Sequence, residues 1–352
     1  MATIRAWAAP GVASALGAAL LFGAGTPLAK RLLQGVDPWV LAGLLYLGSG
    51  LGLGAWRLLR RAPRVRLARA ELAWFAAAVG FGGVLGPVLL MLGLRGMPAS
   101  GAALLLNAES VFTALLAWFV FRENFDRRIA LGMLAIVAGA TLLGGTGAGA
   151  RWSLHELAPA ALVLGACLAW GIDNNLTRKV SLADATWVAS VKGLAAGGVN
   201  LLLALGSGAA LPSLPVAGAA MLVGLLAYGV SLSLFVVALR HLGSARTGAY
   251  FSVAPFFGAL LAVLMGDALS LPLAGAAALM GLGVWLHLSE RHEHVHTHEV
   301  MEHEHEHVHD EHHQHEHEPP VPAGLRHTHM HRHAALTHGH AHVPDVHHRH
   351  EH

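Results

Sequence analysis

Ten long apolar runs constrain this chain more than any other feature, because each run is long enough to cross a lipid bilayer as a helix. Hydrophobic residues make up 55% of the chain and charged residues only 12%, about half of the usual ~25%. A soluble core cannot cover so many consecutive apolar residues, so the sequence predicts an all-α polytopic membrane protein. The predicted spans are residues 11–30, 38–58, 71–94, 97–120, 128–146, 155–177, 184–206, 215–239, 244–266 and 268–289.

The distribution of charge predicts the orientation of these spans. The net charge of +2 combines a balance of +9 over residues 1–290 with a balance of −7 over residues 291–352, so it does not indicate a nucleic-acid partner. With the amino terminus in the cytoplasm, the cytoplasmic segments hold 15 Lys and Arg residues and the outer segments hold 4. Positive charge favours the cytoplasmic side. We therefore expect an inner (plasma) membrane protein with both termini in the cytoplasm.

Two halves of the membrane part can be aligned with each other. Residues 17–31 align with 165–179 at an offset of 148, and Leu94-Arg95 align with Leu239-Arg240 at an offset of 145. Five spans per half is an odd number, so the second half enters the membrane from the opposite side. Such inverted repeats are typical of secondary transporters, whose substrate site lies near the membrane midplane. The predicted domains are a first five-helix repeat at 1–148, a second at 149–290 and a tail at 291–352.

At these motifs the sequence resembles the EamA-like permeases of the drug/metabolite transporter superfamily. The resemblance covers about residues 10–289 and is carried by the ten spans, by the glycine, aromatic and basic residues of the aligned segments, and by Pro255 before an apolar helix that ends in Gly266-Asp267. It implies export or exchange of small metabolites, driven by an ion gradient or a counter-substrate. The halves differ where Glu109 of the first aligns with Ala254 of the second.

Polar residues inside the predicted spans are candidates for a substrate or coupling-ion site. A charged side chain at the centre of a membrane helix costs about 2.5–3.5 kcal/mol, so it must face the bundle interior or a cavity. Glu109 is the leading candidate because a buried carboxylate can take up a proton or a substrate cation. The candidate set is Glu109, Asn107, Asp173, Asn174, Asn175, Lys192, Tyr250, Ser252 and Pro255.

Several of these residues also have structural interpretations. Asp173 can pair with Arg178 or Lys192, and Lys192 can extend to the cytoplasmic face. Pro255 frees a carbonyl and lets its helix bend, which suits a hinge as well as simple packing. Gly82 and Gly86 form a small-residue face that favours close packing inside the bundle, with a homodimer as the alternative use.

The tail alternates histidine with other residues, many of them glutamate, and it holds 23 of the 26 histidines. Neutral imidazole binds Zn, Ni and Co ions, and spacing of two places alternate residues on one side of an extended chain. We expect a disordered, metal-binding segment with no required cofactor. The expected ligands are His292, His294, His296, His298, His303, His305, His307, His309, His313, His315, His317, His327, His329, His331 and His333.

The sequence thus favours a secondary transporter that exports a small metabolite by alternating access and has a metal-binding cytoplasmic tail. The expected partners are the lipid bilayer, a small-molecule substrate and transition-metal ions. A Zn, Ni or Co efflux transporter is one alternative, and a non-transporting membrane-anchored metal sensor or store is another. An enzyme is not expected, because membrane acyl- and phosphotransferases need clustered His, Asp and Glu residues near an interface, and the sequence shows this only in the tail.

Overall fold

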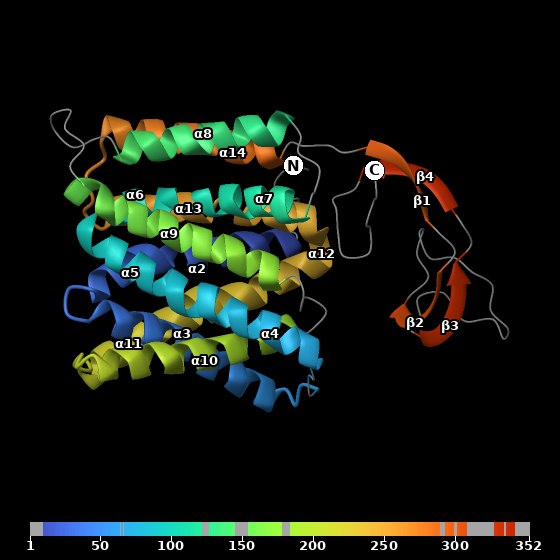
Figure 1. Ribbon diagram of the computed structural model, residues 1–352, viewed down its shortest axis with the longest axis horizontal. Coiled ribbons are helices and arrows are strands. Elements are labelled where there is room, and N and C mark those ends of the chain that lie inside the picture. Colours follow the sequence, from blue (N-terminus) through green and yellow to red (C-terminus); the bar gives the residue numbers. More distant parts are fainter. Residues whose placement is uncertain are drawn as a thin grey trace. The chain divides into compact units, whose positions relative to one another are not determined.

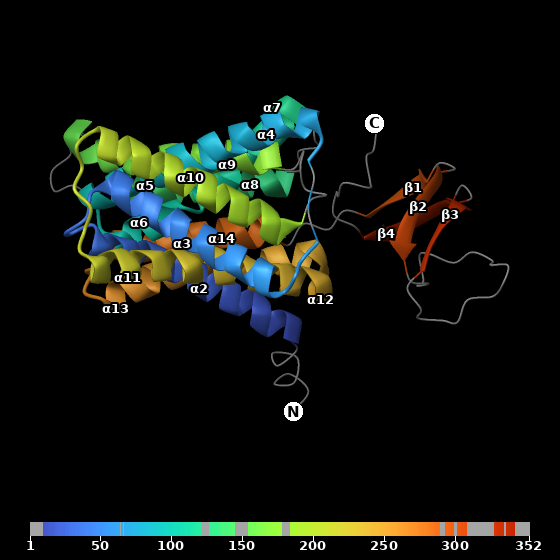
Figure 2. The same cartoon turned by 90° about the horizontal axis from the view of Figure 1, so that it is seen from below.

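The computed structural model describes residues 10–63, 65, 67–121, 127–144, 154–177, 184–288, 293–298, 301–307, 327–333 and 336–341. The chain divides into two compact units, Met1–Glu290 and Arg291–His352. The described part of the first unit is helical, and its helices lie roughly parallel or antiparallel to one another (Figures 1 and 2). Described strands occur in the second unit only.

The helices of the first unit follow the apolar runs closely. Two π-helical segments, η1 (Val79–Leu85) and η3 (Leu225–Val230), interrupt the third and eighth predicted spans. The α-helices are α2 (Pro10–Leu32), α3 (Pro38–Leu59), α4 (Arg69–Ala78), α5 (Gly86–Gly96), α6 (Ala99–Leu105), α7 (Ala108–Phe121), α8 (Arg127–Gly144), α9 (Leu154–Thr177), α10 (Ala185–Gly206), α11 (Leu214–Gly224), α12 (Ser231–Phe251), α13 (Ala254–Leu264) and α14 (Leu271–Leu288).

Seven described helical segments are long and apolar enough to cross a membrane. They match seven of the ten predicted spans. The predicted spans 128–146 and 268–289 correspond to α8 and to the shorter apolar α14, and the predicted span 244–266 is divided between α12 and the short α13. Ten crossings therefore stay a prediction, while a multi-helix membrane protein is confirmed.

One predicted connection is wrong. The sequence pattern separates the eighth and ninth spans at residues 240–243, but α12 runs through these residues as a helix. The corresponding connection in the first half does interrupt the helix, because Met97 is extended and Pro98 follows it. Proline disfavours helical geometry in the preceding residue. The second half has no proline between Pro215 and Pro255, so nothing comparable ends α12 there.

Helices from the two halves pack against each other in matched pairs. In the first half α2 packs on α12 and α13, and in the second half α9 packs on α5 and α7. The bundle is completed by α3 against α10 and by α8 against α14, which lie side by side at one edge (Figures 1 and 2). Each of these contacts joins residues of 1–148 to residues of 149–290.

Interruptions of the helices also recur at one spacing. The segments η1 and η3 begin about 146 residues apart. The break between α6 and α7 at Leu106-Asn107 and the break between α12 and α13 at Ser252-Val253 lie about 146 residues apart as well. These spacings agree with the offsets of 145 and 148 in the sequence alignment.

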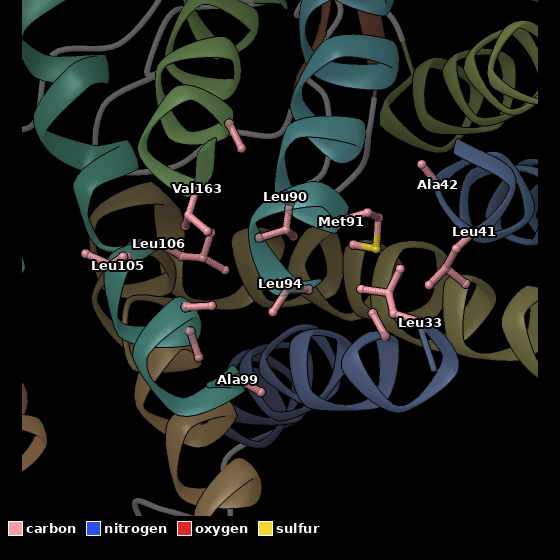
Figure 3. Close-up of a cluster of buried hydrophobic side chains, with 14 of the residues drawn as sticks. Leu33, Leu41, Ala42, Leu90, Met91, Leu94, Ala99, Leu105, Leu106 and Val163 are labelled. Carbon is pink, nitrogen blue, oxygen red and sulfur yellow. The ribbon is translucent and has the colours of Figure 1, made fainter. Parts of the chain in front are cut away.

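The buried core joins both halves. Leu90, Met91 and Leu94 of α5 are almost fully buried and belong to one cluster with Leu105 of α6 and Val163 of α9 (Figure 3). Glycines let the helices approach at several crossings. A side chain at Gly82 would overlap the Asp173 carboxylate, so the expectation of close packing at this glycine face is confirmed.

The second unit contains four short strands, β1 (Glu293–His298), β2 (Met301–His307), β3 (His327–His333) and β4 (Leu336–Ala341). β1 pairs with β4 and β2 with β3, both antiparallel. The prediction of a disordered tail is therefore not confirmed. Alternation of histidine with other residues has the period of two that a β-strand requires, which provides a physical reason for the strands.

Candidate functional site

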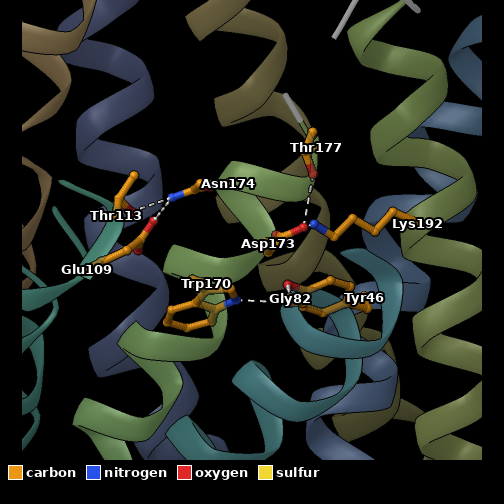
Figure 4. Close-up of polar contacts among 9 residues, drawn as sticks. All are labelled: Tyr46, Gly82, Glu109, Thr113, Trp170, Asp173, Asn174, Thr177 and Lys192. Carbon is orange, nitrogen blue, oxygen red and sulfur yellow. Dashed lines mark hydrogen bonds and ion pairs between the residues drawn. The ribbon is translucent and has the colours of Figure 1, made fainter. Parts of the chain in front are cut away.

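A polar cluster lies along α9, whose side chains contact Glu109 of α7 on one side and Lys192 of α10 on the other (Figure 4). Glu109 lies in the first turn of α7, directly after the break between α6 and α7. Asn174 of α9 donates a hydrogen bond from Nδ2 to Glu109 Oε1 at 2.8 Å and another to Thr113 Oγ1 at 3.3 Å. Within the part of the chain that the structure describes, the Glu109 carboxylate is therefore bound by an amide of the opposite half and not by a cation.

The second part of the cluster is an ion pair on the other side of α9. Lys192 of α10 contacts Asp173 through Nζ and Oδ2, and the two side chains are only 16% and 8% exposed. Thr177 donates to the other carboxylate oxygen of Asp173 at 3.0 Å. Of the interpretations of Lys192, the pairing with Asp173 is the one that the structure contains, and Arg178 lies outside the described residues.

The π-helical segment η1 lies beside Asp173 and accepts hydrogen bonds from three other side chains with its backbone. The carbonyl oxygen of Gly82 accepts hydrogen bonds from the Tyr46 hydroxyl at 2.8 Å and from Trp170 Nε1 at 2.9 Å. Asn200 donates to the neighbouring carbonyl of Gly83 at 3.1 Å. A π-helical turn leaves carbonyls available for such side-chain donors, since it changes the regular hydrogen-bond ladder. Three helices are thus fixed around one short glycine-rich segment.

Two of the predicted site residues are used for local backbone contacts. Asn107 is buried and donates from Nδ2 to the Leu104 carbonyl at 2.9 Å, where it stabilises the break before α7. Asn175 donates to the Gly171 carbonyl at 2.8 Å and to the Thr113 carbonyl at 3.3 Å, which joins α9 to α7.

The candidates of the ninth span lie elsewhere, around the break between α12 and α13. Tyr250 is near the end of α12, Ser252 is its C-cap residue, and Pro255 lies in the first turn of α13. Proline in a first turn removes an amide that would have no helical partner. Among the contacts of the described residues, none joins Tyr250 or Pro255 to Glu109 or to Lys192.

The side chains of the cluster that were not among the candidates include Thr113, Thr177, Tyr46 and Trp170. Thr113 lies four residues after Glu109, the spacing that puts two side chains on one helix face, so this signal was present in the sequence. Tyr46 lies in an apolar stretch of α3 and reaches the cluster through the hydrogen bond of its hydroxyl to the Gly82 carbonyl of η1, for which the sequence offers no local sign.

The predicted metal ligands of the tail divide into two groups. His292, His309, His313, His315 and His317 lie outside the described residues. The other ten lie in the strands. The backbone register places His294 opposite His340 and His296 opposite His338 in the first sheet. In the second sheet the pairs are His303 and His331, His305 and His329, and His307 and His327.

Comparisons with known proteins agree with the helical architecture. Residues 9–145 match the EamA-like transporter family. An "Uncharacterized transporter" of Methanothermobacter thermautotrophicus is 28% identical over 281 residues, which cover 74% of this chain and 80% of that protein. A solved structure, described only as "Crystal structure of protein", has a similar fold, with a TM-score of 0.57 and 22% identity over 78% of this chain and 95% of its own. The EamA-like domain at residues 9–145 and the likeness to this transporter over most of the chain together support a multi-pass membrane transporter.

Proposed function

We propose that this protein is a secondary transporter that exports a small metabolite across the inner membrane by alternating access, with Glu109 at its coupling site. The observation that carries the proposal is the position of Glu109. Its carboxylate belongs to a half-buried residue directly after a helix break, within an apolar span, and is held by an amide from the other half. Interrupted helices in corresponding positions of two halves mark the binding sites of many transporters.

Charge balance indicates what Glu109 binds. The cluster holds two carboxylates, Glu109 and Asp173, but one ammonium group, that of Lys192. One negative charge is therefore in excess when both acids are ionised, and an uncompensated charge inside a membrane protein is costly. Uptake of one proton or of one cationic group neutralises the site. Glu109 is then the residue whose loading is coupled to movement.

The inverted repeat is part of this proposal. It is supported by the matched interruptions of the helices and by the matched packing of α2 on α13 and α9 on α7. Gly23 of α2 lies against Ala254 and Gly258 of α13, and its aligned counterpart Gly171 of α9 lies against Phe112 and Thr113 of α7. Two related interfaces between halves allow rocking around a fixed central site.

The proposal is tested in proteoliposomes loaded with a mixture of small metabolites extracted from cells. Wild-type protein should release at least one compound faster than protein-free liposomes when a pH gradient is applied, as measured by mass spectrometry of the external medium. Glu109→Gln keeps the shape of the side chain but removes the titratable charge, so coupled release should fall at least tenfold. The matched control is Glu71→Gln, which alters a carboxylate that accepts from the Ala68 amide at the start of α4.

Two results would contradict the proposal. One is wild-type release no faster than in protein-free liposomes for every compound in the mixture. The other is a Glu109→Gln protein that releases the same compound at the wild-type rate under the same gradient.

The proposal for the tail is that it binds Zn, Ni or Co ions. Residues directly opposite each other in an antiparallel pair have Cβ atoms about 4.5–5.5 Å apart, and every second pair shares one face. The backbone register thus sets five pairs of histidine positions opposite each other at alternate positions, and imidazole is a good ligand for these ions. Metal content and tolerance of a gene-deletion strain, complemented with full-length protein or with a chain ending at Glu290, test whether this binding matters in the cell. Correction of metal accumulation by full-length protein alone would make metal the cargo or the signal, and unchanged metal content in all strains would contradict both.

A further inference from the structure

Two sequence motifs that the central cluster does not use meet at one end of the bundle. The basic pair Lys30-Arg31 ends α2 in the first half, and Gly266-Asp267 follows α13 in the second half. Arg31 donates from Nη2 to the Met265 carbonyl at 2.9 Å. Asp267 accepts through Oδ2 from the Ser100 amide, near the start of α6, at 2.8 Å. Thus one charged side chain from each half forms a hydrogen bond with the backbone of the other half.

The end of α13 is shaped for both contacts. Gly266 has a φ of 116°, and its amide donates to Val263 while that of Asp267 donates to Ala262. This is the pattern of a Schellman motif, in which a glycine with positive φ ends the helix. The motif turns the chain so that the Met265 carbonyl remains available at the negative end of the α13 dipole, where an arginine is favourable. It also directs Asp267 to α6.

Lys30 fixes the position of its neighbour Arg31. Its ammonium group donates to the carbonyl of Leu94 and, at 3.4 Å, to that of Arg95, at the end of α5. The last turn of α2 is therefore tied to the first half through Lys30 and to the second half through Arg31. Arg95 is another cation at this end of the bundle, but its guanidinium group donates to the Val36 carbonyl of the same half at 3.5 Å.

We propose that Arg31 and Asp267 form a gate that joins the two halves at this end of the bundle, with Lys30 as a positioning residue. We call Arg31, Asp267 and their backbone acceptor and donor, Met265 and Ser100, the α2–α13 gate. The gate consists of two hydrogen bonds, one of them solvent-exposed, so it can break and re-form within the few kcal/mol that separate two transporter states. It is closed in this structure. Its opening would let the halves separate at this end and give access to the Glu109 cluster, so the inference rests on the proposed alternating-access function.

The test measures a distance across the gate and needs no known substrate. Cys167 is the chain's only cysteine, so Cys167→Ala provides a cysteine-free background. Spin labels at Gln34→Cys and Leu269→Cys then report on the exposed connections that follow α2 and α13. Pulsed electron paramagnetic resonance of the protein in lipid nanodiscs gives the distribution of distances between them.

The unsubstituted gate should give a dominant short distance. The double variant Arg31→Met/Asp267→Ala should gain a second population at longer distance, because both hydrogen bonds of the gate are lost. The matched control Arg95→Met removes a cation from the same end but only a contact within the first half, so its distribution should equal that of the unsubstituted gate. The conservative variant Arg31→Lys/Asp267→Glu should restore most of the short population, which a general loosening of the bundle would not predict.

An unchanged distribution in the double variant, or an equal shift in Arg95→Met, would overturn the gate. If the double variant loses its helical circular dichroism, Asp267→Asn takes its place, since an amide oxygen accepts more weakly than a carboxylate. The long population should then be intermediate, and a distribution equal to that of the unsubstituted gate would again overturn the proposal. If the distances between the spin labels do not change but release from proteoliposomes depends on Glu109, the gate proposal fails and the proposed function stands. If the distances change but release does not depend on Glu109, the proposed coupling role of Glu109 fails instead.

Discussion

Lys192 and Asp173 show how one residue depends on another inside an apolar bundle. Each side chain is mostly buried, and each has the other as its opposite charge. Removal of one partner from a buried ion pair typically costs about 3–5 kcal/mol, because the remaining charge is left without compensation. Replacement of both partners costs much less. The pair is therefore a sensitive point for stability as well as for charge balance.

We predict that Lys192→Met lowers the free energy of unfolding by about 3 kcal/mol, and that Lys192→Met combined with Asp173→Leu recovers more than half of this loss. Denaturant titration of the purified protein in mixed micelles, followed by circular dichroism, measures both values. Thr177→Val is the matched control, since it removes the hydroxyl that donates to Asp173 and leaves the ion pair intact. Equal free energies of unfolding for the Lys192→Met protein and the wild type would contradict the burial of this ion pair inside the protein.

Helix packing at the scale of elements depends on particular glycines. Gly23 of α2 lies so close to α13 that an added Cβ would overlap the Ala254 carbonyl and approach the Gly258 amide to 3.0 Å. Gly198 of α10 has no atom within 4 Å of the same position. Both residues are helical, so the intrinsic preference for alanine over glycine is the same at the two positions, about 0.5–1 kcal/mol.

Gly23→Ala and Gly198→Ala should therefore act in opposite directions. Gly23→Ala is expected to lower the melting temperature, because the obstructing atom is backbone and α2 must move away from α13. Gly198→Ala is expected to raise it slightly through helix propensity. Thermal unfolding followed by tryptophan fluorescence compares the two variants. A Gly23→Ala protein at least as stable as Gly198→Ala would show that the α2–α13 crossing is looser than described.

The orientation of the whole molecule is an expectation from its distribution of charge. The predicted topology places the connection of α2 and α3, with Gln34, outside the cell and the connection of α3 and α4, with Arg61, in the cytoplasm. In the Cys167→Ala background, Gln34→Cys should react with a membrane-impermeant maleimide in intact cells. Arg61→Cys should react only after the cells are permeabilised. The reverse pattern would place both ends of the membrane unit outside.

The sequence by itself determined the membrane character of the chain, most helix positions and the likeness between its halves. These properties follow from apolar length and from local motifs, as at Pro38, which begins α3 after the N-cap Asp37. It also selected Glu109, Asp173 and Lys192, because charge inside an apolar run is costly wherever the run packs. The continuation of α12 through residues 240–243 could not be read from composition, since only the absence of a proline distinguishes the two halves there.

Tertiary structure alone decided which polar residues act together. Asn107 is a sequence neighbour of Glu109, whereas Asn174 is 65 residues away, yet it is Asn174 that contacts the carboxylate, while Asn107 donates to the Leu104 carbonyl. The meeting of Arg31 with Met265 and of Ser100 with Asp267 joins residues more than 160 positions apart. No local pattern specifies such contacts, because they depend on how two halves of similar sequence cross in space.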